Sequence, residues 1–200
     1  MRKTKEDTEI SKLRILLAAE EEFCQRGFVG ANIDNIAKAA GLTKGAIFWH
    51  YKSKADLFKE TIKRATGRVK TIFQEVFSSS QPIMEKCREI IKRVKKDKAF
   101  EILTLLSNGD IPNNVLKECG EEISEIYKIA TQSFNDAKNS GELRVDTDIQ
   151  NVLVTITLIM SGFTKIKDTR NIIAPLGGNI DDEYVINAVF EGLLSFQNKK

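Results

Sequence analysis

Residues 32–54 read NIDNIAKAAGLTKGAIFWHYKSK, and this stretch decides the fold. It holds two short apolar segments, Ile33–Ala40 and Lys44–His50, which Gly41 separates. Ala37 is small at the point where a second helix would cross closely, and a glycine permits the positive φ of a tight turn. Two short helices joined in this way predict a helix-turn-helix.

The second of these segments is expected to present two different faces. Ile47 and Tyr51 are four residues apart, so they share one side of a helix and are expected to face a small core. The other positions carry small, basic and aromatic side chains, which suit the major groove of double-stranded DNA. They are Lys44, Gly45, Ala46, Phe48, Trp49 and His50. This surface predicts contact with a nucleic acid.

Three residues that flank the segment are candidates for phosphate contacts. Thr43 stands where it could cap the helix or bond a phosphate, and Asn32 opens the preceding segment. Lys54 opens the next helix and is expected to clamp a flanking phosphate. The base edges would then be left to Lys44, Ala46 and Trp49.

The excess of positive charge lies in the N-terminal third of the chain, which favours a polyanionic partner there. Residues 1–70 hold 15 Lys or Arg against 9 Asp or Glu, whereas residues 71–200 hold 16 against 19. A basic N-terminal module on a mildly acidic body favours such a partner, although an ordinary solvated surface gives the same imbalance. The 200 residues are 42% apolar and 30% charged, which excludes global disorder.

The rest of the chain is predicted to be helical, because apolar residues recur three and four positions apart between the breakers. The first helix closes at Gly27 and buries Ile10, Leu13, Leu16, Leu17, Phe23 and Cys24. Ser53 and Asp56 resemble a capping box at the start of a long helix. Further helices are expected from 53 to about 77, and at 82–96, 99–106, 113–139, 148–167 and 181–197, with a loop at 169–180. Residues 152–157 are β-branched enough to form a strand in isolation, but their setting favours a helix.

Several classes of chemistry are excluded or disfavoured by the composition. His50 is the single histidine, which rules out a multi-histidine metal site and makes zinc and triad chemistry improbable. The three cysteines lack the spacing of metal or redox sites and fit a reduced cytoplasm. The N-terminus is charged, and the longest nearly apolar stretch, 152–163, is too short for a membrane span. We therefore expect a cytoplasmic protein with no metal, no cofactor and no membrane association.

Residues 41–58 resemble the TetR family of transcriptional repressors, and most closely its AcrR-like branch. The resemblance extends over roughly residues 10–62; beyond it only the number and lengths of the helices match. It implies an all-α protein of about nine helices, with a DNA-binding domain at 1–53 and a ligand-binding and dimerisation domain at 54–200. It also implies a homodimer on an inverted-repeat operator, released by a small apolar effector, and no enzymatic activity.

With the motif and the apolar pattern of the later helices, this interpretation assigns residues to three sites. The DNA-binding residues are Asn32, Thr43, Lys44, Gly45, Ala46, Phe48, Trp49, His50, Tyr51 and Lys54. The ligand-binding residues are Phe73, Phe77, Met84, Cys87, Phe100, Leu103, Tyr127, Phe134, Met160 and Phe163, although apolar positions at helical spacing are core more often than cavity. The dimer-interface residues are Val152, Ile156, Ile159, Phe163, Ile186, Val189, Phe190 and Leu193.

Three residues depart from the family pattern, and two rival functions stay open. Glu22 stands where the family usually has a buried Leu, Asn32 where it has Thr, and Phe48 where it has Tyr. Phe48 has no hydroxyl, so a phosphate bond at this position requires Tyr51 or a neighbour. One rival is a helical sensor or carrier that has lost DNA binding, and the other is a helical lyase or isomerase that uses Tyr127.

Overall fold

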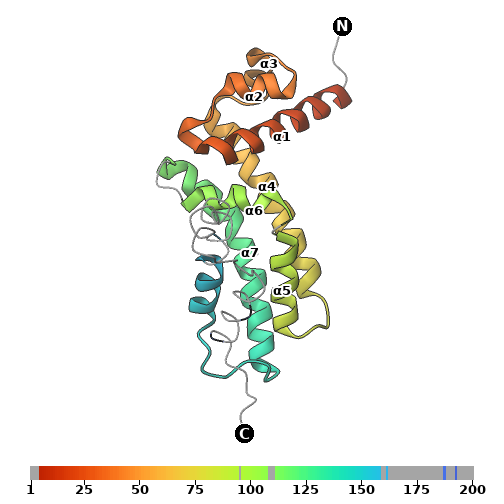
Figure 1. Cartoon of the computed structure of the whole chain (residues 1–200), viewed down its shortest axis with the longest axis vertical. Coiled ribbons are helices and arrows are strands. Elements are labelled where there is room, and N and C mark those ends of the chain that lie inside the picture. Colours follow the sequence, from red (N-terminus) through yellow and green to blue (C-terminus); the bar gives the residue numbers. More distant parts are fainter. Residues whose placement is uncertain are drawn as a thin grey trace, which may run out of the picture. The chain divides into compact units, whose positions relative to one another are not determined.

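A computed structural model describes residues 5–94, 96–107 and 111–158 together with the single residues 161, 187 and 192. These residues form helices and no strand, which confirms the all-α expectation (Figure 1). The elements are α1 Lys5–Gly30, α2 Ile33–Ala40, α3 Lys44–His50, α4 Lys54–Phe77, α5 Ile83–Val94, α6 Lys98–Thr104, the 3₁₀ turn η1 Leu105–Ser107 and α7 Asn113–Asn139. Residues 149–158 are also helical. The last predicted helix and the loop before it lie almost entirely outside the described residues.

Local capping sets the ends of the short helices. The side chain of Asn32 accepts a hydrogen bond from the backbone N–H of Asp34 and starts α2. Gly41 ends α2 with φ 65°, in the left-handed region. The Ser53 hydroxyl accepts from the N–H of Asp56 at 3.1 Å, which is the first half of the predicted capping box. Because these signals are local, the segments expected from the sequence agree with the bounds of α2 and α3.

The chain divides into two compact units, each interrupted in sequence. Unit 1 comprises residues 1–68 and 98–123, and unit 2 comprises residues 69–97 and 124–200. Unit 1 therefore includes α6 and the first part of α7 in addition to the N-terminal helices, whereas the sequence analysis divided the chain after residue 53.

The core of unit 1 is built around an aromatic cluster. The ring of Phe58 on α4 meets Phe23 of α1 edge-on at 4.9 Å and Phe28 at 5.1 Å. Ile15, Ile36 and Ile47 are fully buried beside this group of helices. The cluster fixes α4 against α1, and α2 in turn packs against α1 and α3 against α2.

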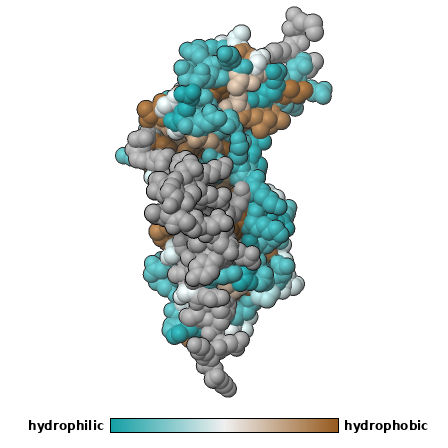
Figure 2. Space-filling view, in the orientation of Figure 1, coloured by the Kyte–Doolittle hydropathy of each residue, from teal (hydrophilic) through white to brown (hydrophobic). Residues whose placement is uncertain are grey.

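The predicted apolar stripe of α1 was wrong in part. Ile10, Leu13 and Leu17 are about half exposed, and Figure 2 shows apolar surface along this helix. The buried face instead carries Ser11, Ile15, Leu16, Ala19, Glu20, Glu22 and Phe23. Gly27, predicted to close the helix, has φ 67° and kinks it, and α1 then continues to Gly30.

In unit 2, aromatic rings of α4 and α7 pack against one another. Phe77 at the end of α4 lies edge-on to Phe73 and to Phe134 of α7, at 5.6 and 6.4 Å between ring centroids. The carboxylate of Glu142 accepts from the N–H of Ile83 at 2.7 Å at the start of α5. The β-branched segment is helical through residue 158, as predicted, and Asp148 caps its start by accepting from the N–H of Asn151.

Candidate nucleic-acid interface

The turn between α2 and α3 holds the two helices in a fixed relation. The N–H of Gly41 donates to the carbonyl of Lys38 at 3.1 Å, and the N–H of Leu42 donates to that of Ala37 at 2.9 Å. The Thr43 hydroxyl then caps α3 by accepting from the N–H of Ala46 at 3.2 Å. Of the two roles proposed for Thr43, the structure contains the cap.

Helix α3 buries one side and exposes the other. Ile47 is fully buried and Tyr51 is 5% exposed, as their spacing predicted. On the opposite side the side chains of Phe48 and Trp49 are 45% and 68% exposed. Lys44 and Gly45 are exposed, and Ala46 and His50 are half-buried. Two large aromatic side chains on a short solvent-facing helix are unusual for a packing role and are suited to contact with a partner.

Tyr51 does not belong to this exposed surface, and its assignment as a DNA-binding residue is corrected. Its hydroxyl is buried and has no hydrogen-bond partner in the described part of the chain. Burial, followed by the charges of Glu60 and Glu9, raises the pKa of the phenol to about 12. The hydroxyl therefore cannot supply the phosphate bond that Phe48 lacks.

Replacing Tyr51 by phenylalanine is expected to raise the free energy of unfolding by about 1 kcal/mol, because it removes a buried polar group that nothing satisfies. Because burial raises the pKa of this phenol to about 12, the free energy of unfolding of the native chain is expected to fall as the pH rises from 10 toward 12, where the unfolded chain loses the proton first. Urea denaturation monitored by circular dichroism at neutral pH measures the change. If Tyr51→Phe bound DNA as weakly as Lys44→Ala, the Tyr51 hydroxyl would be shown to reach DNA.

The two lysines assigned to DNA are both engaged within unit 1. Lys44 forms an ion pair with Asp34 of α2 at 2.9 Å. Lys54 donates to the carbonyls of Val29 and Ala31 at 3.0 and 3.2 Å, and its ammonium lies 5.1 Å from the ring of Phe28. Lys54 thus caps the end of α1, which corrects its assignment as a phosphate clamp in this conformation. Lys44 remains exposed and can exchange its carboxylate for a phosphate.

Glu22, one of the departures from the family pattern, bonds to the start of α2. The carboxylate of Glu22 is buried, and it accepts from the backbone N–H of Asn32 and the side-chain amide of Asn35, both at 3.0 Å. Arg26 supplies the positive partner at 3.3 Å. A leucine could not make these bonds, so Glu22 takes over the anchoring of α2 by hydrogen bonding. Sequence reasoning noticed each residue separately but had no signal that they meet.

Comparison with known proteins agrees with this geometry. Residues 15–61 match the family model described as bacterial regulatory proteins, tetR family. The AcrR regulator of Shigella flexneri is 48% identical over 59 residues, which cover 30% of this chain and 27% of that protein. The TtgR regulator of Pseudomonas putida is 42% identical over 57 residues, covering 28% and 27%. The chain therefore matches less than a third of the length of either relative.

Residues 15–61 are thus similar to the N-terminal domain of TetR-family regulators. Over nearly the whole chain, the fold is similar to that of FadR from Bacillus subtilis, solved in complex with stearoyl-CoA. That structure aligns with a TM-score of 0.73 at 19% identity and covers 92% of this chain and 97% of that one. The likeness of fold thus extends beyond residues 15–61.

Of the predicted ligand-binding residues that the structure describes, three lie in the buried core. Met84, Cys87 and Phe134 are buried, and Phe73, Phe100 and Leu103 are half-buried. Tyr127 is partly exposed and bonds the hydroxyl of Thr157 at 2.8 Å. Phe77 does line a cavity of about 700 Å³ in unit 2, together with Gln74, Ile83, Lys86, Ile129 and Gln132 among others. Met160 and Phe163 lie outside the described side chains.

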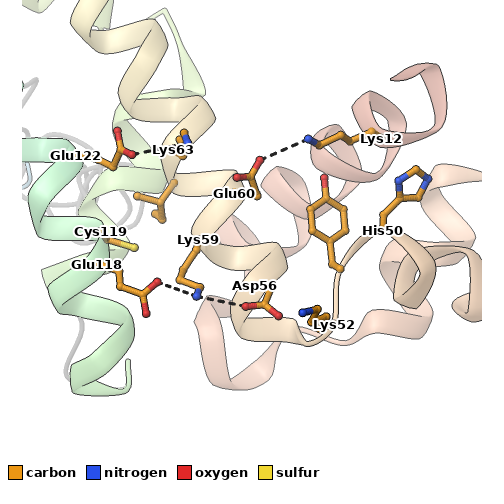
Figure 3. A pocket seen from close by; sticks show the side chains of 12 residues that line it. Lys12, His50, Lys52, Asp56, Lys59, Glu60, Lys63, Glu118, Cys119 and Glu122 are labelled. Atoms are coloured by element: carbon orange, nitrogen blue, oxygen red, sulfur yellow. Dashed lines mark hydrogen bonds and ion pairs between the residues drawn. The ribbon is translucent and has the colours of Figure 1, made fainter. Parts of the chain in front are cut away.

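A second hollow, of about 560 Å³, lies in unit 1 beside the end of α3 (Figure 3). Lys59 bridges Glu118 at 2.8 Å and Asp56 at 3.3 Å, and Lys12 pairs with Glu60 at 3.8 Å. These pairs join α4 to α7 and to α1, so the charges that line the hollow already neutralise one another. We interpret the hollow as a solvent-filled groove between helices and not as a ligand site.

The predicted dimer interface falls largely outside the described residues. Val152 is buried within unit 2 and Ile156 is half-buried. The exposed apolar residues on this helix are Val154 and Leu158, four positions apart. Ile159, Phe163, Ile186, Val189, Phe190 and Leu193 are not described.

The thiols are chemically quiet, and no metal cluster occurs among the described residues. Burial raises the pKa of Cys24 and of Cys87 to about 12, and that of Cys119 to about 11. At neutral pH the reactive thiolate is therefore a negligible fraction. Among the described helices, none has the length and apolarity needed to cross a membrane.

Proposed function

We propose that this chain is a ligand-responsive transcription regulator, most simply a repressor near the AcrR-like branch, that binds DNA as a homodimer. The observation that carries the proposal is the exposed face of α3, on which Lys44, Phe48 and Trp49 stand outward while Ile47 anchors the helix. A short rigid helix with this surface fits the major groove. Residues 1–53 supply the DNA-binding elements, and residues 54–200 supply the ligand and dimer functions.

Two copies of α3 would contact two half-sites of an inverted repeat. In such dimers the recognition helices stand about one turn of B-DNA apart, roughly 34–36 Å. An effector that favours a different spacing would release the DNA. The loss of DNA-binding free energy is bounded by the difference between the effector's binding free energies for the two conformations, typically 1–3 kcal/mol. The cavity in unit 2 supports an effector site. The fold-level similarity to a regulator solved with stearoyl-CoA supports an apolar effector.

Replacing Lys44 by alanine is expected to raise the Kd for DNA by roughly tenfold, because one cation is lost from the surface of α3. The melting temperature is expected to stay nearly unchanged, because the Lys44–Asp34 pair is exposed. DNA fragments retained by the purified protein are first sequenced, and fluorescence anisotropy then measures the Kd of both chains over a range of salt concentrations. Binding by the unchanged chain should fall steeply with salt.

Lys128→Ala is the matched control, since Lys128 is also exposed and pairs with Glu125 at 2.7 Å, but in unit 2. Its Kd should equal that of the unchanged chain. A salt-independent affinity, or equal losses of binding and melting temperature in the Lys44 variant, would contradict the proposal. A protein that binds apolar compounds and retards no DNA would instead be the sensor or carrier, and turnover of a substrate would favour the enzyme.

A further inference from the structure

The cations that remain available on the helix-turn-helix are not those that the motif suggested. Lys44 pairs with Asp34, and Lys54 is held by two backbone carbonyls. A phosphate that approaches either lysine must therefore displace an internal partner. Arg14 of α1 and Lys38 of α2 are exposed. Within the described residues, neither of these two side chains makes a hydrogen bond or an ion pair.

Arg14 occupies a defined place against the turn between α2 and α3. A Cβ atom built on Gly41 would meet Nη2 of Arg14 at 2.5 Å and Cζ at 3.7 Å. The guanidinium can lie there only because residue 41 has no side chain. The same glycine donates its N–H to the carbonyl of Lys38. The guanidinium of Arg14, from α1, and the carbonyl of Lys38, from α2, therefore both lie beside Gly41, in the turn that leads into α3.

We propose that Arg14, assisted by Lys38, forms a phosphate-binding site at the α2–α3 turn and contacts the DNA backbone beside the groove that α3 enters. The proposal rests on the DNA-binding function proposed above and adds a contact that the motif residues do not include. The site recognises the phosphodiester itself, so it is independent of base sequence.

Three properties favour Arg14 over the motif lysines for this role. A guanidinium presents a flat fork of N–H donors that matches the oxygens of a phosphate. The guanidinium lies in a space that a Cβ atom on residue 41 would invade, so it stands next to the turn that leads into α3. Among the residues that the structure describes, no carboxylate pairs with Arg14, whereas Asp34 pairs with Lys44 at 2.9 Å. Each phosphate that Arg14 neutralises also releases counterions from the duplex.

The test uses a 30-base-pair duplex of mixed sequence, because a backbone contact contributes to non-specific binding. Fluorescence anisotropy at several salt concentrations gives the Kd and the slope of log K against log salt. Arg14→Ala is expected to raise the Kd by about tenfold and to lower the slope by about one per module. Arg14→Lys should keep the slope but have an intermediate Kd, since it retains the charge without the fork.

Lys117→Ala is the control, because Lys117 is another exposed cation of unit 1, on α7, and it also makes no hydrogen bond or ion pair within the described residues. It should match the unchanged chain. Equal Kd and slope for the Arg14 and Lys117 variants would overturn the phosphate site while leaving the proposed function intact. Failure of the unchanged chain to bind the duplex at low salt would overturn the proposed function first. The melting temperature of Arg14→Gln, measured beside its Kd, separates a lost DNA contact from a lost fold. If the Kd rises only in proportion to a fall in melting temperature, the phosphate site is overturned.

Discussion

Replacing Phe58 by alanine is expected to lower the free energy of unfolding by about 3–5 kcal/mol, a large part of the stability of a typical domain. Phe58 is fully buried, and its ring makes edge contacts with Phe23 and Phe28. The substitution therefore removes apolar burial, leaves a cavity and abolishes two aromatic contacts at once. Because the cluster joins α4 to α1, the loss extends to the base of α2 and α3.

Phe48→Ala is the matched control for Phe58→Ala, since the chemical change is identical and only the burial differs. Phe48 is 45% exposed, so its removal is expected to change stability by less than about 0.5–1 kcal/mol. On the proposed function, Phe48→Ala weakens DNA binding at unchanged stability. Urea denaturation of the three chains at one protein concentration, monitored by circular dichroism, gives the comparison. Equal losses of stability would contradict the aromatic cluster as the core of unit 1.

Replacing Glu20 by alanine is the second large expected effect, a loss of about 2–4 kcal/mol in the free energy of unfolding. The Glu20 carboxylate is buried and contacts both Arg64 and Arg68 of α4. The two terminal nitrogens of Arg68 donate to one of its oxygens at 3.2 Å. Without the carboxylate, two guanidinium groups would face each other at close range with no counter-charge. Their partial exposure to solvent places the expected loss below that of a fully buried pair.

The neighbouring residue provides the control for Glu20. Glu21 pairs with Lys98 at the surface, and the hydrogen bond from Lys98 lowers the pKa of its carboxyl below the ordinary value. Exposed pairs contribute about 0–1 kcal/mol, so Glu21→Ala should be nearly neutral. Thermal and urea unfolding of both variants measure the difference. A Glu20 variant as stable as the Glu21 variant would show that the two arginines find other partners.

Local signals explain why so much of the fold was predictable. The bounds of α2, α3 and α7 agree with the segments expected from the sequence. Glycine at a left-handed turn and Thr43 as a cap act over three or four residues, so a single sequence contains all the information they require. The separation of α3 into a buried side and an exposed side also followed from spacing alone.

Contacts between distant residues explain the errors. Nothing near Lys54 in sequence indicates that the carbonyls of Val29 and Ala31 lie within reach of its ammonium. Ile10, Leu13 and Leu17 have the spacing of a buried stripe, but which face of α1 is covered depends on where α2, α4 and α6 pack. The unsatisfied hydroxyl of Tyr51 likewise arises from its neighbours in space.

The sequence by itself determined the helices, the helix-turn-helix and the residues of α3 that stand outward, because periodicity and capping are properties of a few consecutive residues. Helix packing settled which charges are paired: Lys54 and Glu20 are held by groups of unit 1, Glu22 bonds to the start of α2, and Arg14, beside Gly41, has no ion pair within the described residues. The physical reason is that a charge is paired or free according to what lies within a few ångströms of it in space, and helix packing brings those groups together from positions 10 to 60 residues apart.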